Sequence, residues 1–176
     1  MSIKNEVINA IIKIEGGYVN NPNDSGGATK YGITEKVARK NGYKGNMKDL
    51  QKQFAFTIYA KRYWKAVKAS EIEMISQSLA REVVDTGVNM GTGRAGKFLQ
   101  RSLNVLNDKE RYYMDLVVDG DIGPATINAL KMYDKFRDVD IITKMCNALQ
   151  GAFYVTLAEK RKKDETFIYG WFKHRI

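Results

Sequence analysis

Apolar positions recur at helical spacing along most of this chain. This pattern predicts helices over residues 3–15, 34–42, 46–66, 72–91, 92–106, 124–133 and 139–162. Between the first two helices, residues 16–34 are rich in Gly, Asn, Asp, Ser and Pro, which favour turns, with one short hairpin expected at residues 28–33. Residues 107–123 lack helical spacing and are expected to be irregular. The pattern therefore indicates a mainly α protein, with α+β character at most through that hairpin.

The first predicted helix ends on a carboxylate. Glu15 is followed by Gly16 and Gly17, and glycine readily adopts the left-handed conformation that ends a helix. Glu15 is thus expected at the negative end of the helix dipole, next to apolar neighbours, and both influences favour the protonated carboxyl. A protonated carboxyl near neutral pH is what a general acid requires. The alternative is an ordinary solvated glutamate in the last helical turn.

A second carboxylate and a hydroxyl follow in the polar loop. Asp24 comes nine positions after Glu15, and Thr29 comes five positions after Asp24. Two acids and a hydroxyl are the groups that hydrolysis of a glycosidic bond by an activated water requires. A carboxyl separation of about 6.5–9.5 Å would indicate an inverting enzyme, and about 5–5.5 Å a retaining one. The alternative is that Asp24 only caps its own loop.

Three further polar residues are candidates for lining a saccharide cleft. Asp85 and Asn89 are four positions apart and share a helix face among valines, which fits either a hydrogen-bonded buried network or the wall of a cleft. Tyr31 belongs to the polar loop and is the third candidate. The aromatic residues Tyr63 and Trp64 are typical of a core, with sugar stacking as the less favoured alternative.

Cysteine and histidine usage excludes several kinds of site. The single Cys146 excludes an internal disulfide within one chain, and its apolar helical surroundings favour a buried, inert thiol. The lone His174 excludes Ser-His-Asp catalysis and most histidine-based zinc sites. We therefore expect neither a metal nor a cofactor.

The chain carries a formal net charge of +9, and much of the excess lies between residues 36 and 68. The cations in this basic window, opposed only by Asp49, are Lys36, Arg39, Lys40, Lys44, Lys48, Lys52, Lys61, Arg62, Lys65 and Lys68. A basic surface attracts polyanions, whether nucleic acid, an anionic membrane or a cell wall bearing carboxylates and phosphates. Solvated helix faces are the alternative, and charge alone does not choose among the partners.

No run of about 18 apolar residues exists, so we expect no stable membrane insertion. The first residues show no signal-peptide pattern, which predicts synthesis in the cytoplasm. A substrate outside the cytoplasm would then require another route of release.

The stretch from Glu15 to Thr34 resembles the N-terminal signature of glycoside hydrolase family 108, which comprises N-acetylmuramidases of phage and bacterial origin, some described as secretion activators. The resemblance continues through Tyr59, Tyr63-Trp64, Asp85, Val88-Asn89 and Gly91. The second half is similar to the helical peptidoglycan-binding region that usually follows in such proteins. Its matching residues are Val118-Asp119-Gly120, Ile122-Gly123-Pro124, Thr126, Phe153-Tyr154, Gly170-Trp171 and Arg175.

This resemblance implies a lysozyme-like helical fold with a catalytic region at 1–92 and a peptidoglycan-binding region at 93–176, packed as one globule. It also implies a glycoside hydrolase that cuts the β-1,4 bond between N-acetylmuramic acid and N-acetylglucosamine, with Glu15 as the catalytic acid. Asp24 and Thr29 carry over by similarity to phage lysozymes, although their interval here is one residue shorter. Ser25 stands where the family commonly has proline, which changes the stiffness of the loop.

The implied protein is a monomeric, bacteriolytic peptidoglycan hydrolase, such as a prophage endolysin that reaches the periplasm or exterior through a holin or another route. One alternative is a catalytically weak protein that binds peptidoglycan or regulates secretion. Another is a lytic transglycosylase, which needs only one acid. A nucleic-acid-binding protein is supported by charge and aromatic residues alone, and no recognisable binding module accompanies them, so we expect no nucleic-acid partner.

Overall fold

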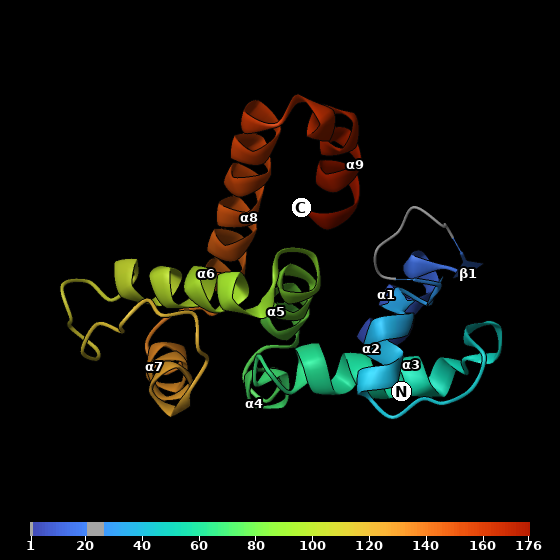
Figure 1. Ribbon diagram of the computed structural model, residues 1–176. Helices are drawn as coiled ribbons and strands as arrows, with labels where there is room; N and C mark the ends of the chain where they lie inside the picture. The colour runs from blue at the N-terminus through green and yellow to red at the C-terminus, as the bar shows by residue number, and fades with distance from the viewer. Residues whose placement is uncertain (1, 21–26) are drawn as a thin grey trace. The chain divides into compact units, whose positions relative to one another are not determined.

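The computed structural model describes residues 2–20 and 27–176, which form two compact units divided between Trp64 and Lys65 (Figure 1). The described elements of the first unit are α1 (Ile3–Glu15), β1 (Tyr18–Val19), β2 (Thr29–Lys30), β3 (Ile33–Thr34), α2 (Glu35–Lys40), the 3₁₀ turn η1 (Met47–Asp49), α3 (Lys52–Tyr59) and the π-helical turn η2 (Ala60–Trp64). Those of the second unit are α4 (Ala69–Glu73), α5 (Gln77–Met90), α6 (Thr92–Val105), α7 (Pro124–Asp134), α8 (Asp140–Lys160), the 3₁₀ turn η3 (Lys162–Asp164) and α9 (Glu165–Arg175).

Helix α1 forms as its periodicity predicts. The Ser2 hydroxyl caps its start by accepting a hydrogen bond from the Asn5 backbone N–H. Its buried face packs against α3 and consists of Ile3, Val7, Ile8, Ile11 and Ile12. Burying this aliphatic face fixes the direction in which α1 delivers its last residue, Glu15.

The three short strands form one antiparallel sheet in the order β1-β2-β3. Tyr18 lies opposite Lys30, and Thr29 lies opposite Thr34. Strands β2 and β3 are joined by a two-residue turn whose residues both have positive φ, 54° at Tyr31 and 71° at Gly32. Positive φ at both central residues is the backbone that a tight hairpin requires. The predicted hairpin is therefore confirmed, with β1 as an additional strand.

The expectation of one helix over residues 46–66 is wrong. Asn46 accepts a hydrogen bond from the Lys48 N–H and starts η1 instead of a long helix. The backbone then becomes extended at Leu50, with φ −54° and ψ 120°, and the Leu50 side chain is buried. Gln51 precedes α3, also in extended geometry. The extended backbone at Leu50 accompanies the burial of its side chain. A continuous helix would have to continue through this position with helical backbone angles.

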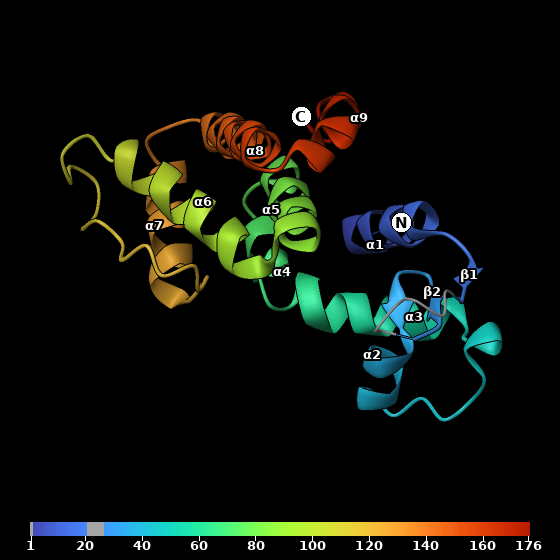
Figure 2. The same ribbon diagram turned by 45° about the horizontal axis from the view of Figure 1, so that its top comes forward.

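Helices α5, α6 and α8 pack on one another and form the core of the second unit. Large aliphatic side chains fill it, among them Leu79, Leu99, Leu103, Leu130 and Ile142. The expected single helix over residues 72–91 is interrupted, because the Ser76 hydroxyl accepts from the Leu79 N–H and starts α5 as a separate helix. Helix α9 folds back along α8, so the aromatic C-terminal segment packs on the unit (Figures 1 and 2).

The irregular segment 107–123 is fastened to α6 through a buried amide. Gln100 Nε2 donates to Asp119 Oδ1 at 2.8 Å and to the Asp121 carbonyl at 3.0 Å, while its Oε1 accepts from the Gly120 N–H at 2.8 Å. The backbone of Gly120 approaches α6 so closely that a Cβ on Gly96 would collide with it. The Asp119-Gly120 motif therefore has a structural role.

The described residues are mostly helical and contain one small sheet, so the predicted mainly α class with a short hairpin is confirmed. Within the part of the chain that the structure describes, no helix is long and apolar enough to cross a membrane.

Candidate active site

Glu15 is the last residue of α1, and Gly16, with φ 77°, ends the helix directly after it. The expected position at the helix C-terminus is confirmed. Glu15 is exposed, however, and its neighbour Ile14 is 71% exposed, so the expectation of apolar surroundings is wrong. The aliphatic face of α1 turns toward α3 and leaves the end of the helix, with its carboxyl group, open to an approaching molecule.

The β2–β3 turn lies against this carboxyl group. The Tyr31 N–H donates to the Gly16 carbonyl at 3.1 Å, which ties the turn to the end of α1. A Cβ on Gly32 would lie 2.9 Å from Glu15 Oε2 and closer still to the Tyr59 hydroxyl oxygen. No side chain fits at position 32, because the Glu15 carboxylate and the Tyr59 phenol occupy that space.

Tyr59 supports the turn from the end of α3. Its hydroxyl donates to the Tyr31 carbonyl at 3.2 Å, and its ring is buried. Burial, and secondarily the nearby Glu15 carboxylate, raises the pKa of Tyr59, so its hydroxyl stays protonated and remains a donor. Sequence reasoning left Tyr59 out of the candidate site. The signal that could have found it was its phenol, because a buried tyrosine needs a hydrogen-bond partner.

Thr29 lies in the central strand β2, opposite Val19 of β1 and Thr34 of β3, and is half-buried. The first unit thus brings Glu15, Thr29 and Tyr31 to one small sheet and the helix end beside it. Asp24, the proposed second carboxylate, lies outside the described residues, and its role stays a prediction.

Asp85 and Asn89 belong to α5 in the second unit. Asn89 Nδ2 donates to the Asp85 carbonyl at 2.8 Å and to Asp85 Oδ2 at 3.0 Å, and Arg175 Nη1 lies 2.9 Å from Asp85 Oδ1. Burial raises the pKa of Asp85, and the Arg175 guanidinium is the strongest opposing influence. These hydrogen bonds hold the end of α9 against α5. The network is not fully buried, because Asn89 is exposed and lines a pocket of the second unit, so a role in lining a saccharide cleft stays a prediction.

Glu82, one turn before Asp85, is a buried acid that sequence reasoning missed. Its side chain is 8% exposed, and the Thr86 hydroxyl donates to its Oε1 at 3.0 Å. Burial raises the pKa of Glu82 to about 7. A glutamate within the apolar stripe of Leu79 and Val83 was the signal, since a charged residue at such a position must lose water on folding.

The remaining candidates have structural roles. Trp64 is 2% exposed and belongs to the core, while Tyr63 stacks on Tyr59 with ring centroids 5.6 Å apart. Cys146 is buried as predicted, and burial raises the pKa of its thiol to about 12, which keeps it unreactive. Within residues 2–20 and 27–176, no cluster of three or more Asp, Glu, His or Cys side chains is arranged to hold a metal.

Comparison with known families places both halves of the chain. Residues 8–91 match the family described as Glycosyl hydrolase 108, and residues 94–176 match the family described as Predicted Peptidoglycan domain. The chain combines a glycosyl hydrolase 108 domain with a peptidoglycan domain. Glu15, Thr29 and Tyr31 lie within the first match, as do Asp85 and Asn89, whereas Arg175 lies within the second.

A solved structure, that of Brucella abortus SagA, is similar over 97% of this chain and 87% of that chain, with a TM-score of 0.68 and 26% sequence identity. No curated protein matches the chain. The resemblance to glycoside hydrolase family 108 is therefore confirmed, and the family supports a hydrolase-like role on peptidoglycan, with peptidoglycan as a partner. The division into regions 1–92 and 93–176, the monomeric state and the cellular location stay predictions.

Proposed function

We propose that this glycosyl hydrolase 108 protein is an N-acetylmuramidase that hydrolyses the β-1,4 bond between N-acetylmuramic acid and N-acetylglucosamine in peptidoglycan. The observation that carries the proposal is the Glu15 carboxyl group, which is exposed at the end of α1 and lies beside the Tyr31–Gly32 turn. The peptidoglycan domain at residues 94–176 supports the choice of polymer. We also propose that the protein acts on the cell wall as a monomer, after leaving the cytoplasm through a holin or another route.

In the proposed reaction, the Glu15 carboxyl group donates its proton to the glycosidic oxygen as the C1–O bond breaks. The leaving sugar departs with a new hydroxyl, and positive charge develops at C1 of the muramyl residue. Asp24 stabilises this charge or removes a proton from the attacking water, and Thr29 holds that water. The water oxygen then bonds to C1 and completes the hydrolysis.

The position of Glu15 depends on the hairpin turn beside it. A general acid must keep its carboxyl oxygen within hydrogen-bond reach of the leaving oxygen. The turn closes one side of the Glu15 side chain, since Gly32 lies directly beside its Oε2. Tyr59 in turn fixes the hairpin through the Tyr31 carbonyl. Tyr59 is thus a positioning residue that acts through the turn.

The test is digestion of purified peptidoglycan, with mass spectrometry of the products. We expect Glu15→Gln to lower the rate by about 10²- to 10⁴-fold, the usual contribution of a general acid, while the far-UV circular dichroism spectrum is unchanged. Glu35→Gln is the matched control, because the Glu35 carboxylate pairs with Arg39 on the surface of the same unit. Near wild-type digestion by Glu15→Gln would remove the assignment.

The products separate the alternatives. Reducing N-acetylmuramic acid ends support the proposed hydrolysis, whereas 1,6-anhydro ends identify a lytic transglycosylase. Binding of the wild-type protein to peptidoglycan without release of soluble fragments would identify the catalytically weak binding or regulatory protein.

A further inference from the structure

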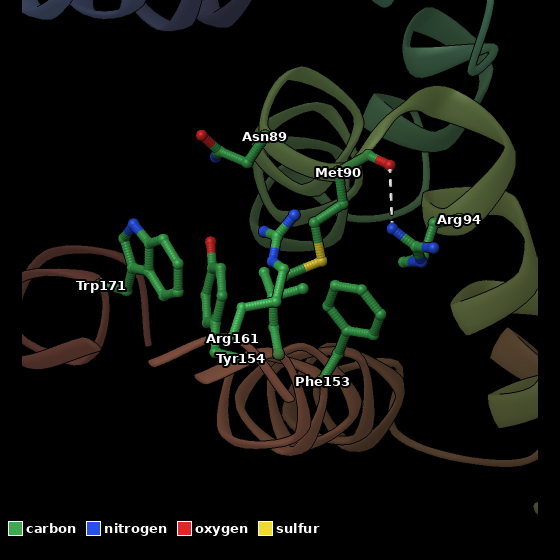
Figure 3. A pocket seen from close by; sticks show the side chains of 8 residues that line it. Asn89, Met90, Arg94, Phe153, Tyr154, Arg161 and Trp171 are labelled. Atoms are coloured by element: carbon green, nitrogen blue, oxygen red, sulfur yellow. Dashed lines mark hydrogen bonds between the residues drawn. The ribbon is translucent and has the colours of Figure 1, made fainter. Parts of the chain in front are cut away.

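A pocket of about 490 Å³ lies within the second unit. Its lining residues come from other parts of the chain than Glu15, Asp24 and Thr29, the candidate catalytic residues. Figure 3 shows its arrangement: the end of α5 and the start of α6 form one side, and α8 with α9 forms the other. The described residues that line it are Asn89, Met90, Arg94, Phe153, Tyr154, Leu157, Arg161 and Trp171. Two of these are arginines, and none is acidic.

Arg94 supplies a fixed cation to the pocket. Its guanidinium carbon lies 3.9 Å from the centroid of the Phe153 ring, and its Nη1 donates to the Met90 carbonyl at 3.3 Å (Figure 3). Within the part of the chain that the structure describes, no carboxylate lies at ion-pair distance from Arg94. One guanidinium nitrogen is thus used in holding the side chain, which leaves the other donors for a bound anion.

The second arginine is largely neutralised. Arg161 Nε donates to Asp164 Oδ2 at 2.6 Å, and its Nη2 lies 2.5 Å from the same oxygen. Arg94 is therefore the cation with unused charge in this pocket. A guanidinium can hold a carboxylate through two parallel hydrogen bonds, which makes a planar carboxylate a fitting ligand.

Apart from the two arginines and the amide of Asn89, the lining side chains are aromatic or aliphatic. Tyr154 and Trp171 stack with ring centroids 4.7 Å apart, and Tyr154 itself is buried. Met90 and Leu157 add aliphatic surface beside the arginines. A ligand for this pocket carries an anionic group for Arg94 and small apolar groups for the adjacent wall.

We propose that this Arg94 pocket binds the peptide stem of peptidoglycan, with a stem carboxylate on Arg94 and the methyl groups of its lactyl and alanyl parts against Met90 and Leu157. The inference takes peptidoglycan as the polymer from the proposed function. It adds that the second unit recognises the peptide stem. The glycan backbone of N-acetylglucosamine carries no carboxylate, so the unused cation favours the stem over the sugar chain. Most of the lining residues lie within the matched peptidoglycan domain, residues 94–176.

The test uses the full-length protein and muramyl dipeptide, a soluble fragment that joins N-acetylmuramic acid to two amino acids and ends in a free carboxylate. Binding is followed by isothermal titration calorimetry, a readout that wild type and every variant share. We expect Arg94→Gln to weaken binding by at least about tenfold, since a hydrogen bond to a charged group is lost. Arg101→Gln is the matched control, because Arg101 is an exposed arginine of the same helix outside the pocket; its binding should equal that of wild type.

A change in the ligand tests the same contact without any mutation. Muramyl dipeptide whose terminal carboxylate is converted to an amide should bind wild-type protein about as weakly as the free acid binds Arg94→Gln. For the aromatic wall, Trp171→Leu should weaken binding about fivefold, whereas Tyr169→Leu, at a position that is 76% exposed on the same helix, should not.

Three results would overturn the proposal: unchanged affinity in Arg94→Gln, equal affinity for the amidated ligand, or displacement of muramyl dipeptide by equimolar glycerol phosphate or oligo-dT. The last would identify a phosphate or nucleic-acid site instead. These outcomes are separable from failure of the proposed function. If release of reducing ends depends on Glu15 but the affinity for muramyl dipeptide is unchanged in Arg94→Gln, only the proposed ligand site at Arg94 is rejected. If binding of muramyl dipeptide depends on Arg94 but the protein does not cleave peptidoglycan, only the proposed enzymatic function is rejected.

Discussion

The carboxylates of the two units differ in what surrounds them. Glu15 in the first unit is exposed at a helix end, with a glycine turn packed against it. Glu82 and Asp85 in the second unit lie one turn apart on α5, where burial raises both pKa values and Thr86 and Arg175 provide partners. The comparison shows two kinds of surroundings: an accessible carboxyl group at a helix end, and buried carboxyl groups with hydrogen-bond partners inside a unit. In the second unit, Asp85 holds α9 against α5 through Arg175, and Glu82 accepts a hydrogen bond from Thr86 of its own helix.

The largest expected effect comes from filling the space beside Glu15. Gly32→Ala must place a Cβ at φ 71° into the position of the Tyr59 hydroxyl and the Glu15 carboxyl. We expect a loss of about 3 kcal/mol in the free energy of unfolding, combining left-handed backbone strain with overpacking, and a marked fall in peptidoglycan digestion. Urea unfolding and a digestion assay measure the two losses.

Gly42→Ala is the control for that change. Gly42 has a similar φ of 88°, but no atom of the described residues lies within 4 Å of the place that a Cβ would take. The variant should show only the backbone cost of about 1–2 kcal/mol and retain digestion. Equal losses in the two variants would mean that packing around Glu15 is unimportant.

The buried acid of the second unit should make stability depend on pH. Burial raises the pKa of Glu82 from 4.5 to about 7, so its contribution is fully present below pH 4.5 and is lost as pH rises through 7. At pH 8 we expect Glu82→Gln to be more stable than wild type by about 3 kcal/mol, and at pH 4 to differ little. Urea unfolding at both pH values is the measurement. Glu159→Gln, an exposed glutamate on α8, should show neither difference.

Removing the hydroxyl of Tyr59 should have a smaller effect. Tyr59→Phe keeps the buried ring but loses the hydrogen bond to the Tyr31 carbonyl, which should cost about 1 kcal/mol in the free energy of unfolding. Because the turn that it holds lies against Glu15, the digestion rate should fall without a change in affinity for peptidoglycan. Tyr63→Phe is the matched control. A rate loss in both variants, or in neither, would contradict a positioning role for Tyr59.

The smallest expected effect concerns the basic window, whose ten cations are all exposed. Binding of Glu15→Gln to purified cell walls should weaken steadily as the salt concentration rises from about 0.05 to 0.5 M, because salt screens exposed charges. Sedimentation with wall fragments measures it. Binding that is independent of salt would show that these cations are solvated surface side chains that do not contribute to wall binding.

Local sequence predicted the helices, the hairpin and the helix end that carries Glu15, because each depends on neighbouring residues. It missed two breaks because the apolar spacing continues across them. One is at Leu50, whose side chain is buried, and the other is before Ser76, whose hydroxyl caps a new helix. Tyr59 and Gly32 were also missed as parts of the site. Tyr59 reaches a backbone carbonyl 28 residues away in the chain, and only the folded structure shows which positions meet at that distance.

Gln100 gives the irregular segment beside α6 an unexpected kinetic property. The Gly120 N–H donates to the buried Gln100 side chain at 2.8 Å, and Gly120 packs directly on the backbone of Gly93 and Gly96. An amide held in this way exchanges its hydrogen with solvent only when the supporting helix opens. Hydrogen exchange of Gly120 should therefore follow the opening of α6, making this stretch of loop part of the helix's cooperative unit.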